Sequence, residues 1–383
     1  MLKKSIVYLN YSPYENSGHI LEYLLQNFEK VYLFSIAFHT LGKKSQNKFT
    51  IYKKGKLYSE EYLFYMDVPE SLVFFFIPFR SVLNALQIVI RIIKIKNNYG
   101  AIDVFFTVNA FTATLGRFLK KLYVVKQTVF WVWDYYPIRH PSILATIMRR
   151  LYWQFDKYAT HSDRVIYLHK RLADVRKKTG VISKNEKCIV VPIGTGERIR
   201  ITKKDTKIIK IGFIGVLKKS QGVDMILDSG VVLSKHFKHI VFEIIGSGPD
   251  EEYFIKRKRN TKLVTYNFYG YVNEEKFRKI LSGCMIGIAP YKPEKSTMSS
   301  YTDPGKPKRY IEFNLPVITT DVIEFSKEIE KNGAGIVIKY NDLEEFAQAI
   351  KIILKNYPKY RKDVIRLHEK YYYKKIYPTI FSF

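Results

Sequence analysis

Short apolar runs of strand length alternate with helix-like stretches along most of the sequence, and this alternation is the feature that most constrains the fold. In the first half, the expected strands cover residues 5–9, 31–35, 103–108, 128–133, 164–168 and 188–191. Helical patterns lie between them, as at residues 18–28, 141–158 and 170–178. Such alternation predicts a mostly parallel sheet covered by helices.

A second alternating set begins at Lys210, after a break at residues 192–197 and a polar, basic segment at residues 198–207. Its strands are expected at residues 211–214, 240–245, 264–269, 285–289, 316–319 and 335–338. Its helices are expected at residues 223–233, 251–259, 274–281, 308–313 and 343–354. A chain of 383 residues exceeds what one core usually supports. We therefore predict an α/β protein with two Rossmann-like domains, residues 1–197 and 198–357.

The formal net charge of +29 favours an anionic partner, which could be nucleic acid, an anionic membrane or a phosphate-rich substrate. Cys188 and Cys284 are the only cysteines and lack metal-ligand spacing, so we expect no disulfide scaffold, no zinc site and a reducing cytosol. The first ten residues are expected to form a strand rather than a signal peptide. No stretch is expected to be apolar enough for long enough to span a bilayer.

The segment at residues 211–222 combines a strand, a glycine-containing turn and the start of a helix. Gly215 and Gly222 allow the backbone to approach a ligand closely. Free backbone N–H groups and the helix dipole favour a phosphate at such a place, and Lys218 and Lys219 add positive charge. An ordinary βα turn with surface lysines is the commoner explanation of such a segment taken alone.

Two further turns follow expected strands of the second half. Gly246 and Gly248 form a tight turn at the carboxyl end of a strand, where open α/β sheets bind ligands. Tyr271 and Val272 follow the next strand, just before Asn273, a plausible helix N-cap. Taken alone, the first of these turns is better explained as a plain turn, and a structural strand end is the alternative for the second.

The most informative segment runs from Tyr301 through Asp303, Gly305 and Lys306 into the strand expected at residues 316–319. Lys306 stands at the start of a helix, where a cation opposes the helix dipole. This local cost predicts that Lys306 faces an anion supplied from outside. The alternative is a solvated surface lysine beside a Pro-Gly turn.

In this order and spacing, the four segments resemble the C-terminal domain of GT-B glycosyltransferases, most closely family 4. The resemblance covers residues 207–355 and implies a second domain that holds a nucleotide-sugar donor. The residues implied in donor binding are Gly215, Lys218, Gly222, Gly246, Gly248, Tyr271, Val272, Asp303, Gly305 and Lys306.

The N-terminal half resembles the same family more loosely. Gly18 matches the first glycine-containing loop, and residues 131–140 match the strand end that faces the donor sugar. Residues 192–194 match the end of the first domain. Residues 369–375 resemble the last helix, which implies that residues 358–383 return to the first domain across a cleft between the two.

The sequence departs from the family pattern at several positions. Many members carry an Arg and a Lys after the first glycine turn, where this chain has Val216 and Gln221. Many also carry paired glutamates around the donor loop, where this chain has Tyr301 and Arg309. The departures leave open how ribose and sugar are bound, and they leave open a degenerate, inactive member.

The expected chemistry follows from the charge that develops on a departing nucleoside diphosphate. No Asp-x-Asp triplet occurs in the sequence, so we expect no metal ion, and protein groups must balance this charge. We assign that task to the Gly215 turn, Lys306 and Lys218, with no cofactor beyond the donor substrate. Resemblance to family 4 implies retention without a protein nucleophile.

Asp134 and His140 complete the catalytic candidates as groups that position the sugar or the acceptor. Asp134 acting as a general base would instead favour inversion. For both residues a purely structural role, as a cap or loop contact, is the alternative.

Residues 80–96 alternate apolar side chains with Arg91, Lys94 and Lys96, after a very apolar, aromatic stretch at residues 72–79. A basic amphipathic helix beside aromatics can dock on an anionic membrane, although a core-facing helix explains the same pattern. We expect a cytoplasmic enzyme, peripheral on the inner membrane face, that acts on a glycan or lipid-linked acceptor of the cell envelope or an exopolysaccharide.

Two other classes remain as alternatives. A nucleotide-sugar epimerase of the same fold would bind the same donor and isomerise it without an acceptor. A non-enzymatic nucleic-acid binder would use the positive charge, but the sequence carries no helix-turn-helix, zinc or RNA-binding aromatic signature, so we expect no nucleic-acid partner.

Overall fold

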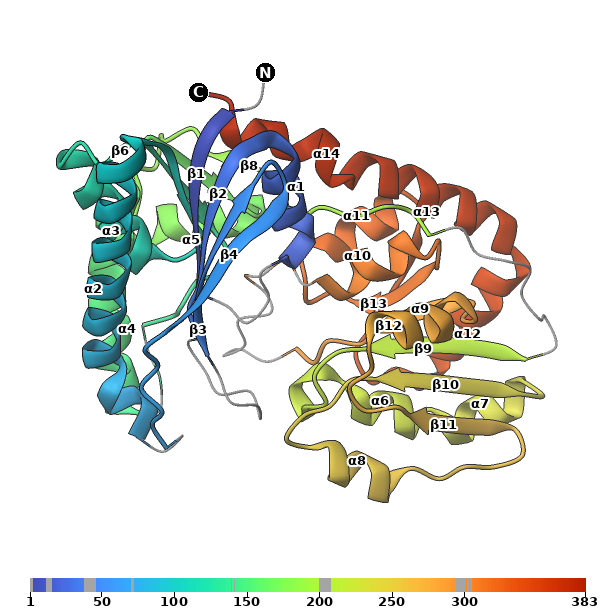
Figure 1. Ribbon diagram of the computed structural model, residues 1–383. Coiled ribbons are helices and arrows are strands. Elements are labelled where there is room, and N and C mark those ends of the chain that lie inside the picture. The colour runs from blue at the N-terminus through green and yellow to red at the C-terminus, as the bar shows by residue number, and fades with distance from the viewer. Residues whose placement is uncertain are drawn as a thin grey trace. The chain divides into compact units, whose positions relative to one another are not determined.

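The computed structural model describes residues 3–11, 16–37, 46–69, 72–138, 140, 142–199, 208–293, 301, 303 and 305–383. The chain divides into two compact units, one of residues 1–193 with 376–383 and one of residues 194–375. Each unit has its own sheet (Figure 1). The division falls after Ile193 rather than after Glu197, and only residues 376–383 of the expected C-terminal segment group with the first unit.

The first unit contains an eight-stranded sheet in the order β4-β3-β2-β1-β5-β6-β7-β8. Six of these strands pair in parallel, and both faces of the sheet carry buried side chains. Because both faces are buried, these strands are continuous apolar runs in the sequence. The sequence predicts them for that reason. Their bounds are β1 Lys3–Asn10, β2 Phe28–Ser35, β5 Ile102–Thr107, β6 Val125–Val132, β7 Arg164–Tyr167 and β8 Ile189–Val190.

The remaining two strands, β3 (Asn47–Lys53) and β4 (Lys56–Leu63), form an antiparallel hairpin at one edge of this sheet that the sequence did not predict. Lys54 and Gly55 at its turn both have positive φ, of 48° and 75°. This backbone suits a tight hairpin connection with the right-handed twist of the strands. Most of β4 is exposed, so no apolar run marks it in the sequence.

Helices cover both faces of the first sheet. On one face lie α2 (Val73–Tyr99), α3 (Ala110–Lys121) and α4 (Ile143–Ala159), to the left of the sheet in Figure 1. The other face packs against α1 (Ile20–Asn27) and the C-terminal turn at Tyr377–Phe381, through ring contacts with Trp131 and Phe106. Helix α5 (Lys170–Lys178) connects β7 to β8.

Helix α2 corrects one expectation. From Phe75 to Tyr99 it is long and apolar enough to cross a membrane, judged by length and composition alone, so the prediction that no segment would be is wrong on this criterion. Its inner face nevertheless belongs to the core of the first unit, where Ile88, Ile92 and Ile95 are buried.

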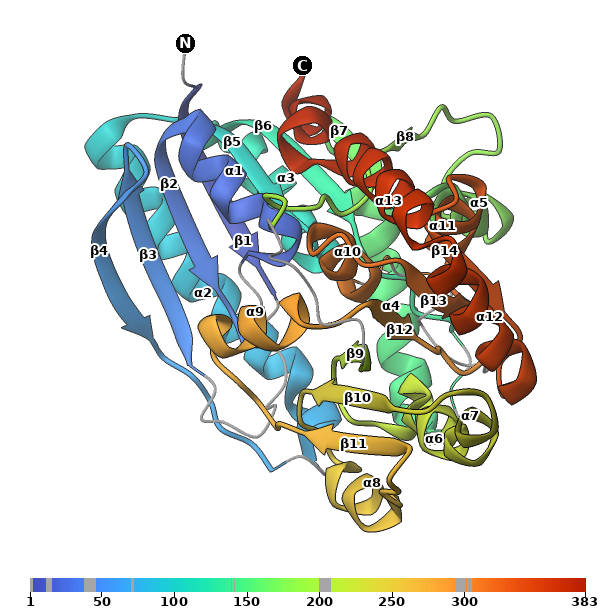
Figure 2. The same ribbon diagram turned by 90° about the vertical axis from the view of Figure 1, so that its right-hand side faces the viewer.

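The second unit contains an all-parallel sheet in the order β11-β10-β9-β12-β13-β14 (Figure 2). Its strands are β9 Ile209–Ile214, β10 Ile240–Ile245, β11 Val264–Phe268, β12 Ile286–Ala289, β13 Val317–Thr320 and β14 Gly335–Ile338. Its helices are α6 Val223–Asp228, α7 Gly230–His236, α8 Glu251–Arg257, α9 Glu274–Ser282, α10 Gly305–Glu312, α11 Phe325–Lys331, α12 Leu343–Lys355, α13 Tyr357–Tyr371 and α14 Tyr373–Ile376. The helix expected at residues 223–233 is therefore two helices, α6 and α7.

Two apolar clusters form the core of the second unit. One joins side chains of α6, α8 and α12 to the sheet, and the other joins those of α10, α11 and α13. The strand order reverses between β9 and β12, because the chain adds β10 and β11 on one side of β9 and then returns to the other. In open α/β sheets, ligands bind outside the carboxyl ends of the strands at such a reversal. The structure thus directs attention to the residues after Ile214 and Ala289.

Candidate donor site

The turn after β9 carries Lys306 directly against it. A Cβ atom added to Gly215 would lie 2.3 Å from Cε of Lys306 and 2.7 Å from its Nζ. Gly215 has a φ of 140°, which favours glycine, and the missing side chain leaves the space that Lys306 occupies. Residues 91 positions apart in the sequence are therefore brought together at the strand-order reversal.

Lys306 lies between aromatic rings and one amide. Its Nζ donates a hydrogen bond to Oε1 of Gln221 at 2.5 Å, and it lies 4.7 Å and 5.2 Å from the ring centroids of Phe213 and Tyr291. Among the described residues, no carboxylate is within ion-pair distance of it. Burial alone lowers the pKa of Lys306 from 10.5 to about 7. An anion placed here would restore the charge of this lysine and be held by it.

Other donors of the same turn are also available to a ligand. The backbone N–H of Val216 donates to none of the described residues. Lys218 is exposed, and within the described part of the chain its ammonium has no partner. Lys219 is different, because its Nζ lies 4.3 Å from the centroid of the Tyr253 ring. Lys218 is thus the lysine of this pair that is free to bind a phosphate.

Gly222 fixes the far end of the turn. It has a φ of 76°, and a Cβ at this position would lie 1.7 Å from the carbonyl oxygen of Pro290, so no other residue fits. This contact joins the turn to the end of β12 and holds the neighbouring Gln221 near Lys306. The two glycines of the turn therefore shape the place that Lys306 and Gln221 share.

Gly246 and Gly248 lie behind the turn rather than in front of it. The backbone N–H of Gly246 donates to the carbonyl of Gly270, and that of Leu217 donates to the carbonyl of Ser247. These bonds tie three successive loops together by their backbones. The contacts assign Gly246 and Gly248 to the support of the Gly215 turn.

Four more predicted donor-site residues belong to the second unit. Gly305 begins α10 and so places Lys306 in its first turn. Tyr271 is highly exposed, whereas Val272 packs partly against an apolar cluster of the second unit. Asp303 and Lys308 form a buried ion pair, which commits the charge of Asp303 to the protein itself.

Arg309, at a position where many family members have a glutamate, is bound by carboxylates of the protein. Its guanidinium donates to Oε2 of Glu312 at 2.6 Å and to Oε1 of Glu274 at 2.9 Å. The other oxygen of Glu312 accepts from the backbone N–H of Gly196 at 2.7 Å. Arg309 and Glu312 therefore anchor the start of the second unit, a role that their spacing alone did not predict.

In the first unit, Asp134 follows the carboxyl end of β6. Burial raises the pKa of its carboxyl group, and the charge of Arg176 opposes this rise. Tyr136 donates a long hydrogen bond of 3.4 Å to it. The neighbouring Trp133 has a buried indole N–H without an acceptor among the described residues. A carboxyl group and a free donor at a strand end suit the hydroxyl groups of a sugar.

Gly18 and His140 make local contacts in the same unit. The carbonyl of Gly18 accepts a hydrogen bond from the Tyr377 hydroxyl. His140 is exposed, and its Nδ1 accepts from the backbone N–H of Ser142 at the start of α4. Its backbone N–H donates to Oγ1 of Thr146. These contacts give both residues a structural part in their loops.

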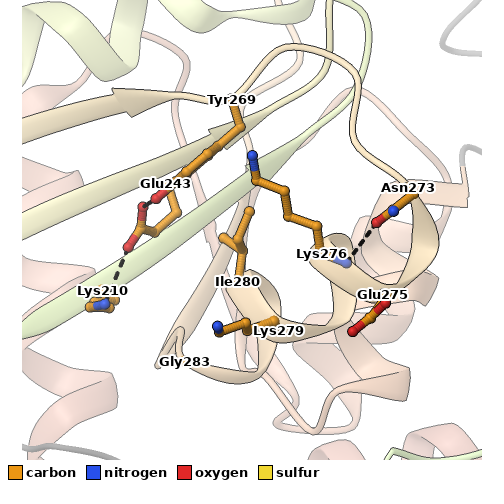
Figure 3. Close-up of a pocket in the computed structure, with 9 residues that line it drawn as sticks. All are labelled: Lys210, Glu243, Tyr269, Asn273, Glu275, Lys276, Lys279, Ile280 and Gly283. Atoms are coloured by element: carbon orange, nitrogen blue, oxygen red, sulfur yellow. Dashed lines mark hydrogen bonds and ion pairs between the residues drawn. The ribbon is translucent and has the colours of Figure 1, made fainter.

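A cavity of about 620 Å³ opens elsewhere on the second unit, between the sheet and α9 (Figure 3). Glu243 lies in it, and its carboxylate is bound by Lys210 at 3.3 Å and by the Tyr269 hydroxyl at 2.7 Å. The cavity contains none of the predicted donor-site residues. Its carboxylate is satisfied by its own neighbours, so the Gly215 turn remains the candidate donor site. Across the described residues, no three His, Cys, Asp or Glu side chains gather in a way that could hold a metal ion.

Two Rossmann-like units in tandem, the second with Lys306 against the glycine turn at its strand-order reversal, have the GT-B fold of glycosyltransferases. Residues 208–356 match the family of glycosyl transferases group 1. This family match lies within the second unit and, together with the fold of the whole chain, supports a glycosyltransferase.

Solved structures with the same fold cover both units. A sucrose-phosphate synthase from Thermosynechococcus elongatus is 13% identical over 98% of this chain and 97% of its own, with a TM-score of 0.65. A lipopolysaccharide outer core galactosyltransferase in its apo form is 13% identical over 99% of each chain, with a TM-score of 0.61. A pneumococcal O-GlcNAc transferase in complex with UDP and GlcNAc is 15% identical over 73% of this chain and 56% of its own, with a TM-score of 0.51. No curated protein sequence matches the chain.

Proposed function

We propose that the protein transfers a sugar from a nucleoside-diphosphate sugar to a glycan or lipid-linked acceptor in cell-envelope or exopolysaccharide synthesis. One observation carries the proposal. The ammonium of Lys306 lies against the Gly215 turn with an amide as its only polar partner among the described residues, and burial lowers its pKa to about 7. A partly buried lysine without a carboxylate partner among the described residues is suited to bind an anionic ligand reversibly.

The chemistry of the turn follows from charge. As the bond between the sugar and the diphosphate breaks, negative charge grows on the departing phosphate oxygens. Lys306, Lys218 and the N–H of Val216 are the groups proposed to balance it, without a metal ion or other cofactor. Removing one such preorganised group costs about 3 kcal/mol in the barrier, or about a hundredfold in rate.

Retention of the anomeric configuration is the proposed outcome, with an oxygen of the departing phosphate taking the proton of the acceptor. Asp134 then positions a sugar or acceptor hydroxyl, together with the indole N–H of Trp133. Because burial raises the pKa of Asp134, this group is also a candidate base, and a base would favour inversion. The configuration of the product, read by proton NMR coupling, decides between the two.

The acceptor and its place are proposals of the same kind. The galactosyltransferase with the same fold is named for the lipopolysaccharide outer core, and the O-GlcNAc transferase was solved with UDP. These names support a nucleoside-diphosphate sugar as donor and an envelope glycan as acceptor. We place the enzyme in the cytoplasm, at the inner face of the membrane.

The test is a thermal-shift panel of nucleoside diphosphates and nucleotide-sugars, followed by transfer assays with the best donor in EDTA. Ligands of the native state raise the apparent stability, by about 2.7 kcal/mol at a hundred times the dissociation constant. We expect one nucleoside diphosphate to stabilise the protein strongly and Lys306→Met to abolish the shift. An isomerised donor formed without acceptor would instead establish an epimerase, and salt-dependent binding of nucleic acid without any nucleotide shift would refute the enzyme.

A further inference from the structure

Helix α2 presents an unusually apolar outer face. Its exposed apolar residues recur every three or four positions, which places them in one stripe along the helix. Their exposed fractions lie between 38% and 67%. The stripe consists of Phe75, Phe79, Val82, Leu86, Ile90 and Ile93.

Helix α4 extends this surface. It contacts α2, and both helices lie on the same side of the first sheet in Figures 1 and 2. Its own exposed apolar residues are Ile143, Leu144, Ile147 and Leu151. We call the two sets together the α2/α4 face. Exposed apolar side chains gathered on two helices in contact mark the place of a partner.

The charges on the helices of this layer are almost all positive. Helices α2, α3 and α4 contain a single acidic residue, Asp156, which is buried in an ion pair with Arg176. They contain ten basic residues: Arg80, Arg91, Lys94, Lys96, Arg117, Lys120, Lys121, Arg149, Arg150 and Lys157. The chain as a whole has 64 basic and 35 acidic residues, so acids are depleted specifically in this layer.

Two of the ten are neutralised by neighbouring elements, since Arg91 pairs with Glu61 and Lys120 with Asp163. Lys94, Arg150 and Lys157 are exposed and have no acidic partner among the described residues. The uncompensated charge therefore lies on the same two helices as the apolar stripe.

We propose that the α2/α4 face is a docking surface for an anionic lipid bilayer. The exposed apolar side chains enter the headgroup boundary, while lysines and arginines on the same helices reach the anionic phosphates. Helix α2 docks along the surface rather than crossing the bilayer, because its opposite side buries Ile88, Ile92 and Ile95 in the core. Charge complementarity selects the lipid over a second copy of this chain, which would bring the same positive charge.

The position of the α2/α4 face agrees with the proposed function. The docking surface itself does not depend on that function, but a lipid-linked acceptor does. The apolar residues of α4 lie in its first three turns, and α4 begins soon after the strand end that carries Asp134. A bilayer at the α2/α4 face thus adjoins the carboxyl edge of the first sheet. A sugar carried on a lipid would reach that edge with its tail still in the membrane.

The test is co-sedimentation of the full chain with vesicles of phosphatidylcholine alone or mixed with phosphatidylglycerol, at low salt. One variant combines Phe79→Ser, Leu86→Ser and Ile90→Ser, and its control is Val231→Ser with Ile352→Ser on exposed sites of the second unit. A charge variant combines Lys94→Glu, Arg150→Glu and Lys157→Glu. Its control has the same net charge through Lys235→Glu, Lys262→Glu and Lys359→Glu, all exposed in the second unit.

We expect binding to the anionic vesicles only. The charge variant should lose about a hundredfold in partitioning, from about 1 kcal/mol for each Lys or Arg near the surface. The apolar variant should lose at least as much, and both controls should bind like the original protein. An unchanged thermal shift with the best nucleoside diphosphate shows that each variant is folded. If the proposed donor site is wrong, the original protein itself shows no such shift, while vesicle binding is unaffected.

Equal binding by variants and controls would overturn the proposal, because the charge of the whole chain would then suffice. Equal binding to neutral vesicles would overturn its electrostatic half. Vesicle-independent dimers that dissociate only in the apolar variant would overturn it in favour of a second copy of the chain.

Discussion

Replacing Lys306 with methionine should make the protein more stable and unable to bind a nucleoside diphosphate. The ammonium of Lys306 lies over the rings of Phe213 and Tyr291 and donates a hydrogen bond to Gln221. Methionine has a similar length and is apolar, so it fills the same space without the cost of holding a charge there. Lys306, which is proposed to bind the ligand, thus lowers the free energy of unfolding of the ligand-free protein.

The magnitude follows from the pKa. Burial lowers the pKa of Lys306 from 10.5 to about 7. Between pH 7 and pH 10.5, the unfolded chain therefore holds a proton on this lysine that the folded protein has released. Stability from this group therefore rises with pH through that window, and the full cost applies below pH 7. At pH 7 the shift corresponds to at most about 4 kcal/mol, and at pH 9 to about 2 kcal/mol. Lys306 is partly exposed, and the lost hydrogen bond subtracts about 1 kcal/mol, which leaves a gain of about 2 kcal/mol at pH 7.

Thermal unfolding of the ligand-free proteins at pH 7 and pH 9 measures this gain. We expect Lys306→Met to raise the transition of the second unit by about 4–8 °C at pH 7 and by much less at pH 9. The control is Lys219→Met on the same turn, whose exposed ammonium lies over Tyr253 and should change little. A variant that is less stable at pH 7, or a gain that does not shrink at pH 9, would refute the assignment of an uncompensated lysine.

The remaining predictions concern the same site and its supports. The affinity for a nucleoside diphosphate should fall by up to about tenfold per pH unit above pH 7, because the anion binds the protonated form of Lys306, and calorimetry in buffers of different ionisation enthalpy should show proton uptake. Gly215→Val should abolish nucleotide binding while the protein stays folded, since its side chain would occupy the place of Lys306; an unchanged affinity in calorimetry would contradict this. Lys308→Met alone should destabilise the second unit by about 3–5 kcal/mol in urea unfolding because it removes the ion-pair partner of the buried Asp303, whereas adding Asp303→Asn should restore much of the loss. Asp134→Asn should reduce the transfer rate and leave nucleotide affinity in the thermal-shift assay unchanged, because this residue belongs to the first unit and is proposed to touch the sugar or acceptor.

The sequence predicts most of the architecture because most strands are buried on both faces. Strands β10 and β14 have the bounds that the apolar runs predict. The hairpin of β3 and β4 escaped prediction, since its exposed edge strand carries polar residues and its turn is marked only by Lys54 and Gly55. The helix expected at residues 223–233 is interrupted at Ser229, where only the structure shows the break.

The candidate site also contains residues that the sequence singles out and residues that only the fold brings together. The position of Lys306 after a Pro-Gly turn, against the helix dipole, predicts a lysine that faces an external anion, and this stays a prediction. Its neighbours Gln221, Phe213 and Tyr291 come from other strands and turns, so spacing along the chain does not place them beside it. The engagement of Arg309 by two glutamates is likewise visible only once the fold brings Glu274 near α10.

A crystal structure with the nucleoside diphosphate that gives the largest thermal shift would test the central claim most directly. The account predicts that the diphosphate lies at the end of β9, with phosphate oxygens within hydrogen-bond distance of Nζ of Lys306 and the backbone N–H of Val216. A diphosphate bound instead in the cavity beside Glu243, with Lys306 still held by Gln221 alone, would contradict it.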